Sequence, residues 1–439
     1  MWKKSAAILL CIICFFCGCT QIVEPLVDQP VNSASEQPFQ SAPEPLEKIE
    51  IKELPEIQIE RREIEAKEVR YTYSLGVRKK VENALPQIIE FNYPYIYFQT
   101  MLVSDKSDGS IQVSRYSLKS KEVQILADLQ WNAQFNTNEA VCLVGDEFLV
   151  NTVCKSEADH LTMDVAVINL QTAKTEIVYS HPVGNVFTYV KPIEKDAFVV
   201  FFYGQNDSPQ KEIIQYIIYY DLVKRAATTI YKGSVMEWQD PNNSTCDIWA
   251  IDTFEDKVYI VLHQLVDGKM KTFLKSLNKQ GNILFETCLD VLNEYSQKEY
   301  TVYNLAVEGN YVFLNYFQSG NNPPSVVLKK EGNVYNLMDM GQVYPKLLLS
   351  PGTVKSQYLY FSTYPQNWME RTTNAPSSNL LVFDSYSETA FIIPINCDTI
   401  NEVVADINGN LIFSSFTEEL EDHLYYLSYE DIISQMLTK

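Results

Sequence analysis

The feature that most constrains the fold is a strand–turn–strand pattern that returns about every 50 residues. The second strand of each unit begins near residue 95, 148, 198, 258, 311, 358 or 411, at intervals of 47 to 60 residues. Several of the turns before these strands contain glycine, at Gly145, Gly309 and Gly409, and glycine adopts the positive φ angles that tight hairpins need. A period of this length predicts a repeat architecture in which each unit is one small antiparallel sheet.

Each unit continues with two more strands that a polar turn joins. Such turns follow Asn169, Asp221 and Asp384, and the strands beside them are rich in β-branched and aromatic residues, which favour extended backbone. Four strands per unit at this period resemble the β-propeller superfamily, in its WD-like and quinoprotein-like branches, over about residues 68–430. The resemblance implies an all-β, seven-bladed β-propeller. Six or eight blades also fit the spacing, and a two-domain β-sandwich is the structural alternative.

The seventh unit is incomplete at its end. Residues 402–407, 411–416 and 423–428 supply three strands, and residues 429–436 then have the pattern of a short helix. At the other end of the repeat region, residues 68–75 form a strand that belongs to no unit. We predict that this N-terminal strand completes the last blade and closes the ring, because closure removes the exposed edges of a sheet.

The N-terminus has the pattern of a signal peptide. Lys3 and Lys4 precede an apolar run at residues 5–17, and Gly18 and Cys19 follow it; the run is too short to span a bilayer comfortably. This end resembles the lipobox of bacterial lipoprotein signal peptides. The resemblance implies cleavage before Cys19, diacylation of its thiol, acylation of the new amino terminus, and attachment to the extracytoplasmic side of a cell membrane. An ordinary cleaved signal peptide and an uncleaved anchor helix are the alternatives.

A polar segment separates this leader from the repeats. Residues 21–46 are rich in Pro, Gln, Ser and Glu, a composition typical of disorder. Residues 47–67 are charged with interspersed isoleucines, which fits a stiff extended segment or a short helix. We therefore expect three parts: a signal peptide at residues 1–18, a disordered and charged tether at residues 19–67, and a propeller domain with a short C-terminal helix at residues 68–439.

Charge and cysteine content exclude several classes of function. The formal net charge is −21, and such a surface repels nucleic acid. Beyond the leader only five cysteines remain, an odd number, and no two have CxxC spacing. We therefore expect no nucleic-acid partner, no metal site and no cofactor. These cysteines are Cys142, Cys154, Cys246, Cys288 and Cys397.

The predicted loops differ in length on the two faces of the propeller. Within a unit, the turns that join the first strand to the second and the third strand to the fourth are short. The connections from the second strand to the third, and from the fourth strand to the first strand of the next unit, are long and would share one face. Loops on a rigid scaffold commonly carry function, and Trp, Tyr and Arg anchor interfaces. The alternative role for the tryptophans of the long loops is to pack those loops onto the blades. The candidate ligand-binding residues in or near the long loops are Trp131, Tyr203, Trp238, Tyr364, Trp368 and Arg371.

Catalytic motifs are not visible in the sequence. The four histidines are scattered over four units, and no HExxH, GxSxG or P-loop motif occurs. We expect no enzymatic activity, and predict a lipid-anchored binding or scaffolding protein whose loop face binds an envelope protein, peptide or glycan. The alternative is an envelope enzyme that acts on surface glycans or peptides, with a site assembled from propeller loops.

Overall fold

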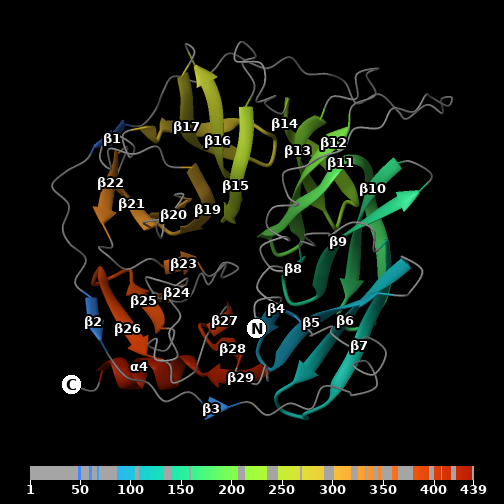
Figure 1. Ribbon diagram of the computed structural model, residues 1–439, viewed down its shortest axis with the longest axis horizontal. Coiled ribbons are helices and arrows are strands. Elements are labelled where there is room, and N and C mark those ends of the chain that lie inside the picture. The colour runs from blue at the N-terminus through green and yellow to red at the C-terminus, as the bar shows by residue number, and fades with distance from the viewer. Residues whose placement is uncertain are drawn as a thin grey trace, which may run out of the picture. The chain divides into compact units, whose positions relative to one another are not determined.

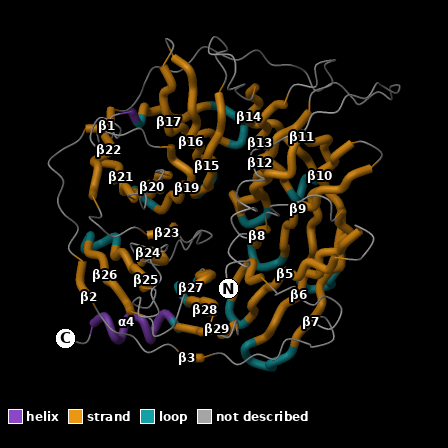
Figure 2. Tube along the Cα trace, in the orientation of Figure 1, coloured by secondary structure: helices purple, strands orange, loops and turns teal. Residues whose placement is uncertain are grey.

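Strands make up nearly all of the part of the chain that the computed structural model describes (Figures 1 and 2). All the described residues lie in the unit Pro43–Lys439. The described residues are 48–50, 59–61, 67–68, 87–103, 108–132, 141–157, 160–205, 213–234, 246–266, 269–290, 301–317, 325–331, 334–339, 345–347, 358–363, 379–394, 400–406, 408–416 and 422–437. Cys19 and most of the expected tether lie outside this set.

The first part of the repeat region forms antiparallel four-stranded meanders. The first meander consists of β4 (Gln87–Asn92), β5 (Tyr95–Val103), β6 (Asp108–Ser117) and β7 (Val123–Asn132). The next seven strands form one sheet, made of β8 (Val141–Val144), β9 (Phe148–Glu157), β10 (His160–Asn169), β11 (Thr175–Glu194), β12 (Ala197–Gln205), β13 (Ile213–Asp221) and β14 (Ala226–Ser234).

Strand β11 belongs to two meanders at once. Its residues 175–182 pair with β10, and its residues 183–194 pair with β12. The fourth strand of one unit therefore continues into the first strand of the next without a loop. This sharing explains why seven strands hydrogen-bond as one sheet although the sequence pattern predicts two four-stranded units there.

Four further sheets complete the described structure. One consists of β15 (Cys246–Phe254), β16 (Lys257–Val266), β17 (Lys269–Asn278) and β18 (Ile283–Cys288). The next contains β19 (Thr301–Glu308), β20 (Tyr311–Phe317), β21 (Ser325–Glu331) and β22 (Val334–Asp339). The last two contain β23 (Pro345–Leu347), β24 (Tyr358–Thr363), β25 (Asn379–Asp384) and β26 (Thr389–Pro394), and then β27 (Ile400–Ala405), β28 (Leu411–Phe416) and β29 (Asp422–Leu427).

Three short strands from the N-terminal segment join these last sheets. β1 (Lys48–Glu50) pairs in parallel with β22, β2 (Ile59–Arg61) pairs in parallel with β26, and β3 (Lys67–Glu68) pairs antiparallel with β29. The described parts of residues 47–67 are thus extended, which was one of the two expected forms. Ordered strands begin at Lys48, twenty residues before the expected domain boundary. Of the strand expected at residues 68–75, only Glu68 lies in the described set, where it is opposite Tyr425 of β29.

The core consists of apolar side chains between neighbouring sheets. Residues 198–202 of β12 are consecutive hydrophobic residues, and each is at most 1% exposed. A strand shows no polar alternation when both of its faces are covered. One face of β12 packs with β9 and β10, which belong to the other half of the same seven-stranded sheet, and the other face packs with β15 and β16 of the next sheet. The continuous apolar runs of the sequence therefore mark strands buried between two repeat units.

The predicted tight turns and the C-terminal helix are confirmed. Gly145, Gly309 and Gly409 all have positive φ angles, and a side chain at Gly145 would lie 2.6 Å from the Lys195 carbonyl oxygen. The helix α4 (Tyr429–Leu437) begins after Ser428, whose Oγ accepts a hydrogen bond from the Asp431 backbone NH at 3.0 Å. Across the described residues, none of the helices has the length and hydrophobicity needed to cross a membrane.

The last sheet contacts the first one. Ile412 and Leu424 pack in one cluster with Ile88, Phe91 and Phe98 of β4 and β5. Two further contacts join the same sheets. The Tyr93 backbone NH donates to Asp406 Oδ2 at 3.3 Å, and the Tyr93 and Tyr426 rings stack with their centroids 6.0 Å apart.

Candidate functional site

The structure describes only two of the six predicted ligand-binding residues. Trp131 lies in β7 opposite Gly109, because the β6–β7 hairpin stays paired to its end at Asp108 and Asn132. Its placement in a loop was therefore wrong. Tyr203 lies near the end of β12, two residues before the strand ends at Gln205. The remaining predicted residues, which lie outside the described set, are Trp238, Tyr364, Trp368 and Arg371.

Tyr203 is held by packing at the end of its strand. Its ring lies 5.3 Å from that of Phe201 in an edge-on arrangement, and it is half-buried against the cluster between the β11–β14 and β15–β18 sheets. The backbone of Tyr203 pairs with Gln215 of β13. The strand thus fixes this side chain at the end of the sheets opposite the tight turns, which we call the loop face.

Trp249 approaches the loop face from the neighbouring sheet, as the extra residue of a β-bulge. Ile248 pairs with Leu262 and Ala250 pairs with Val261, so Trp249 has no opposite residue in β16. A bulge of this kind re-aims the side chain of the inserted residue. The Trp249 ring is half-buried and meets the His263 ring at 77° with 5.4 Å between centroids.

His263 is the buried polar centre of this region. Its side chain is 7% exposed, and Nδ1 lies 3.2 Å from Oγ1 of Thr272. Nε2 is shielded from solvent and has no hydrogen-bond partner among the described residues. Burial lowers the pKa of His263 to about 4, although the nearby Asp290 opposes the shift. The imidazole is therefore neutral at neutral pH.

Thr272 connects His263 to Asp290, which lies just beyond Cys288 at the end of β18. The Thr272 backbone NH donates to Asp290 Oδ1 at 3.0 Å, and its carbonyl accepts the Leu289 NH at 2.7 Å. Burial raises the pKa of the half-buried Cys288 thiol, so the thiol stays protonated and is not an activated nucleophile. We call Trp249, His263, Thr272, Cys288 and Asp290 the His263 cluster.

A buried glutamine fixes the backbone of β15 immediately before Trp249. Gln215 of β13 is fully buried, and its amide accepts the Ile248 NH at 3.0 Å and donates to the Ile248 carbonyl at 3.4 Å. Paired hydrogen bonds of this kind satisfy the buried amide and hold two sheets in register. The position of the Trp249 bulge is therefore set by both sheets.

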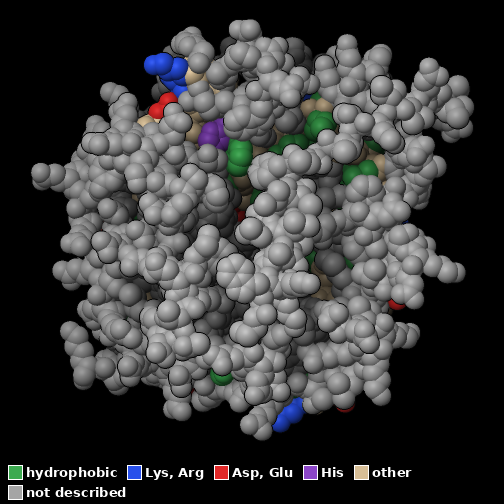
Figure 3. Space-filling model, in the orientation of Figure 1, with side chains coloured by type: hydrophobic (Ala, Val, Ile, Leu, Met, Phe, Trp, Pro, Cys, Tyr) green, Lys and Arg blue, Asp and Glu red, His purple; other side chains and the backbone are tan. Residues whose placement is uncertain are grey.

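The His263 cluster could not be found from the sequence. Its members come from three strands and from the end of β18, and only the strand register brings positions 249, 263, 272 and 290 together. The available signal was a histidine inside an otherwise apolar strand. No group of three or more His, Cys, Asp and Glu side chains that could hold a metal occurs among the residues whose side chains are described. In Figure 3, the visible described side chains over β11–β17 are mainly hydrophobic, with a histidine among them.

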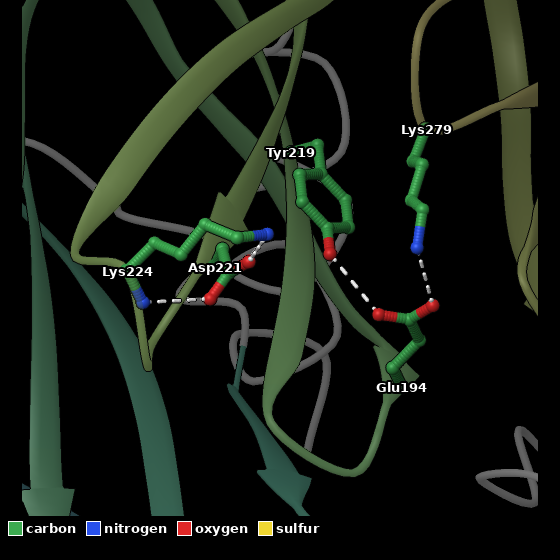
Figure 4. A network of polar contacts seen from close by, with 5 residues as sticks. All are labelled: Glu194, Tyr219, Asp221, Lys224 and Lys279. Atoms are coloured by element: carbon green, nitrogen blue, oxygen red, sulfur yellow. Dashed lines mark hydrogen bonds and ion pairs between the residues drawn. The ribbon is translucent and has the colours of Figure 1, made fainter.

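The opposite face, at the tight turns, carries satisfied polar contacts between sheets (Figure 4). Tyr219 Oη donates to Glu194 Oε2 at 3.1 Å, and Lys279 Nζ lies 3.1 Å from Glu194 Oε1. Lys224 bonds Asp221 through its backbone NH and Nζ, at 2.8 and 2.7 Å, and these bonds lower the pKa of Asp221. Each carboxylate here has partners, so this network links turns and offers no reactive group.

Carboxyl groups also bridge the first strands of neighbouring units. Glu90 of β4 accepts the Leu143 NH of β8 at 3.3 Å, and burial raises its pKa to about 8. Asp252 of β15 accepts the Val307 NH of β19 at 2.9 Å and pairs with Lys191 at 3.3 Å. Burial, followed by the charge of Asp252, raises the pKa of Glu308 to about 7.

Comparisons with known proteins show the fold. No family model and no curated protein matches the chain. The β-propeller domain of the Trilobed protease from Pyrococcus furiosus matches 79% of this chain and 96% of that domain, with a TM-score of 0.52 and 10% identity. An acylaminoacyl peptidase from Pyrococcus horikoshii matches 82% of this chain with a TM-score of 0.50 and 10% identity, and the chain spans 55% of that peptidase's length. The expected β-propeller fold is thereby confirmed.

The same matches correct one expectation. We expected no enzymatic activity because the sequence has no catalytic motif. Both matched structures belong to peptidases, so this fold occurs in enzymes and the argument from motifs was wrong. A propeller scaffold brings residues from distant loops together, so a catalytic set on it need not form a contiguous sequence motif.

Proposed function

We propose that this chain is a propeller that binds peptides at its loop face and takes part in their enzymatic processing at a membrane surface. The observation that carries the proposal is the match of most of the chain to the propeller domain of a protease. This supports the alternative predicted from the sequence, an envelope enzyme acting on peptides, over a purely scaffolding role. Peptides are preferred to glycans because both matched structures are named for action on peptides.

The proposed propeller has seven blades and is closed by the N-terminal strand. The shared strand β11 makes the seven-stranded sheet two blades, so six sheets supply seven. First strands contact each other in the order β4, β8, β11, β15, β19 and β23, and β27 contacts both β24 and β4. The hydrogen bond from Tyr93 to Asp406 joins the last unit to the first as the Glu90 bond joins the first to the second. These contacts support closure, with β3 as the fourth strand of the last blade.

We assign the recognition role to the His263 cluster and the long loops beside it. Trp249 offers a half-buried aromatic surface, which suits the apolar side chain of a peptide. His263 would hold Trp249 in place and would not act as the general base, because an efficient base has a pKa near the working pH. The catalytic groups would then come from the long loops of the same face.

The test uses the mature chain from Cys19 with a defined peptide mixture. We expect mass spectrometry to detect cleaved peptides, and Trp249→Ala to weaken peptide binding about tenfold, as truncation of an aromatic anchor commonly does. Tyr386→Ala is the matched control, because Tyr386 is 83% exposed in the β25–β26 turn on the opposite face. Capture of peptides without their cleavage would show that the protein binds peptides and does not process them. Neither capture nor cleavage would overturn the proposal.

The membrane anchor has its own test. We propose that Cys19 is acylated and holds the protein on the extracytoplasmic side, because two or three acyl chains give stable attachment. Palmitate labelling should mark the wild-type protein and not Cys19→Ser, and Cys19→Ser should move to the soluble fraction. Labelling that persists in Cys19→Ser would exclude this residue as the anchor.

A further inference from the structure

Three short strands within residues 48–68 pair with the edges of three successive sheets. β1 lies along β22, β2 lies along β26, and β3 lies along β29, as Figure 1 shows for the blue strands. In register, Ile49 is opposite Tyr335, Glu60 is opposite Phe391 and Glu68 is opposite Tyr425. One segment of about twenty residues therefore supplies strands that pair with three sheets up to about 90 residues apart in the sequence, and β1 also contacts β18 of a fourth sheet.

The lengths of the two links allow this path. Residues 51–58 connect β1 to β2, and residues 62–66 connect β2 to β3. At no more than about 3.6 Å per residue, these links span at most about 30 and about 20 Å. Along the segment, the pairings follow the chain order of β22, β26 and β29. The order of contacts along the segment is therefore the order of the sheets.

The three sheets that receive these strands are the ones with short strands. Their second and third strands have six or seven residues, whereas those of the first four units have nine or ten. Short strands make fewer ladder hydrogen bonds and depend more on added strands. The outermost strands β7, β14 and β18 of the longer sheets have no added strand within the described part of the chain.

Each of the three contacts is small, with two or three paired residues. A single pairing of this size is weak, but linked pairings hold together because release of one leaves the others in place at a high effective concentration. In the sequence the segment lies between the repeats and Cys19, and residues 19–47 would span roughly 90 Å in a polyproline-like extended form, at about 3.1 Å per residue. A pull from an anchor at Cys19 would reach β1 first, then β2, then β3.

We infer that the strands β1, β2 and β3 together form a releasable clasp that keeps the outer edges of the sheets of β22, β26 and β29 ordered and couples them to the N-terminal anchor. When the clasp opens, the backbone groups of β22 and β26 become available, while the first four units keep their structure. The pairings themselves carry this inference, and only the coupling to a membrane rests on the proposed acylation of Cys19.

Hydrogen exchange on the mature protein tests the clasp. Deletion of residues 48–61 removes β1 and β2 and keeps β3, and deletion of residues 22–35 removes the same number of residues from the polar segment upstream. We expect the first deletion to speed amide exchange in β22 and β26 at least tenfold and to leave β6, β9 and β13 unchanged. The control deletion should change none of these strands.

A point substitution keeps the inference falsifiable if the deletion fails to fold. Glu60→Pro removes a backbone donor from β2 and interferes with pairing, whereas Glu53→Pro lies in the link between β1 and β2. We expect Glu60→Pro to speed exchange in β26 and not in β9, and Glu53→Pro to have little effect. Unchanged exchange in β26 would overturn the inference, and so would loss of protection in every strand, because the segment would then be part of the core fold.

Discussion

The first four units and the last three are stabilised in different ways. In the first four, long middle strands bury continuous apolar runs such as residues 198–202, and Gln215 joins two sheets through its side-chain amide. In the last three, the middle strands are shorter, and the N-terminal segment adds backbone partners from outside. A repeat unit can therefore be stabilised by its own core packing or by pairing with a strand from a distant part of the chain.

The largest expected effect is the loss of an aromatic core residue in the long-stranded part. Phe202 is fully buried and packs against the rings of Tyr216 and His181, with centroid distances of 5.3 and 4.9 Å. Phe202→Ala should lower the free energy of unfolding by about 3–5 kcal/mol, because it removes buried contacts and leaves a cavity. Chemical denaturation measures this loss. The exposed control Tyr386→Ala should change it by less than about 0.5 kcal/mol, and equal losses would contradict the assigned core.

The next effect concerns pH and the carboxyl between the first two units. Burial raises the pKa of Glu90 to about 8 from an ordinary value of 4.5. The folded state therefore holds this proton more tightly, and its contribution to stability falls as pH rises from about 4.5 to about 8. Glu90→Gln removes this dependence, so its stability relative to wild type should rise by about 3 kcal/mol between pH 5 and pH 8, at about 1.4 kcal/mol per unit. A pH-independent difference in denaturation midpoint would contradict it.

A smaller loss of stability is expected when the Asp406 carboxylate is removed from the contact between the last and first units. Asp406 is buried and accepts hydrogen bonds from the backbone NH groups of Tyr93, Asn408 and Asn410. Asp406→Ala leaves these donors unpaired, which should cost about 2–3 kcal/mol and speed amide exchange in β4 and β27. Asp256→Ala, at an exposed turn, is the control. Faster exchange in β12 but not in β4 would show that the contact does not join the two units.

The smallest effect is an acid-side change at His263. Its folded pKa of about 4 lies below the ordinary value of 6.5, because burial disfavours the charged imidazole. The resulting stability is present above pH 6.5 and is lost as pH falls toward 4. His263→Gln should abolish about 2 kcal/mol of the stability change between pH 7 and pH 5, on the scale of about 1.4 kcal/mol per pH unit. Thermal unfolding across this range measures it, and an unchanged profile would place His263 in solvent.

The features that could be predicted from the sequence are local or periodic. The positive φ of Gly145 and Gly409 and the helix after Ser428 depend on a few neighbouring residues, and the structure confirms them. The repeat spacing predicted the propeller fold, which the comparisons confirm. The position of Trp131 could not be predicted this way, since a hairpin continues as long as its partner strand does.

By itself, the sequence of this protein determined the strands, the tight turns and the kind of sheet, because turn residues and hydrophobic period act over short distances. Only the tertiary structure decided which strand lies beside which. A three-residue strand such as β1 has no sequence pattern that predicts its partner. Its position depends on the edge strand β22, about 285 residues further along the chain. The His263 cluster depends in the same way on register, since a shift of one residue would turn its side chains to the other face of the sheet.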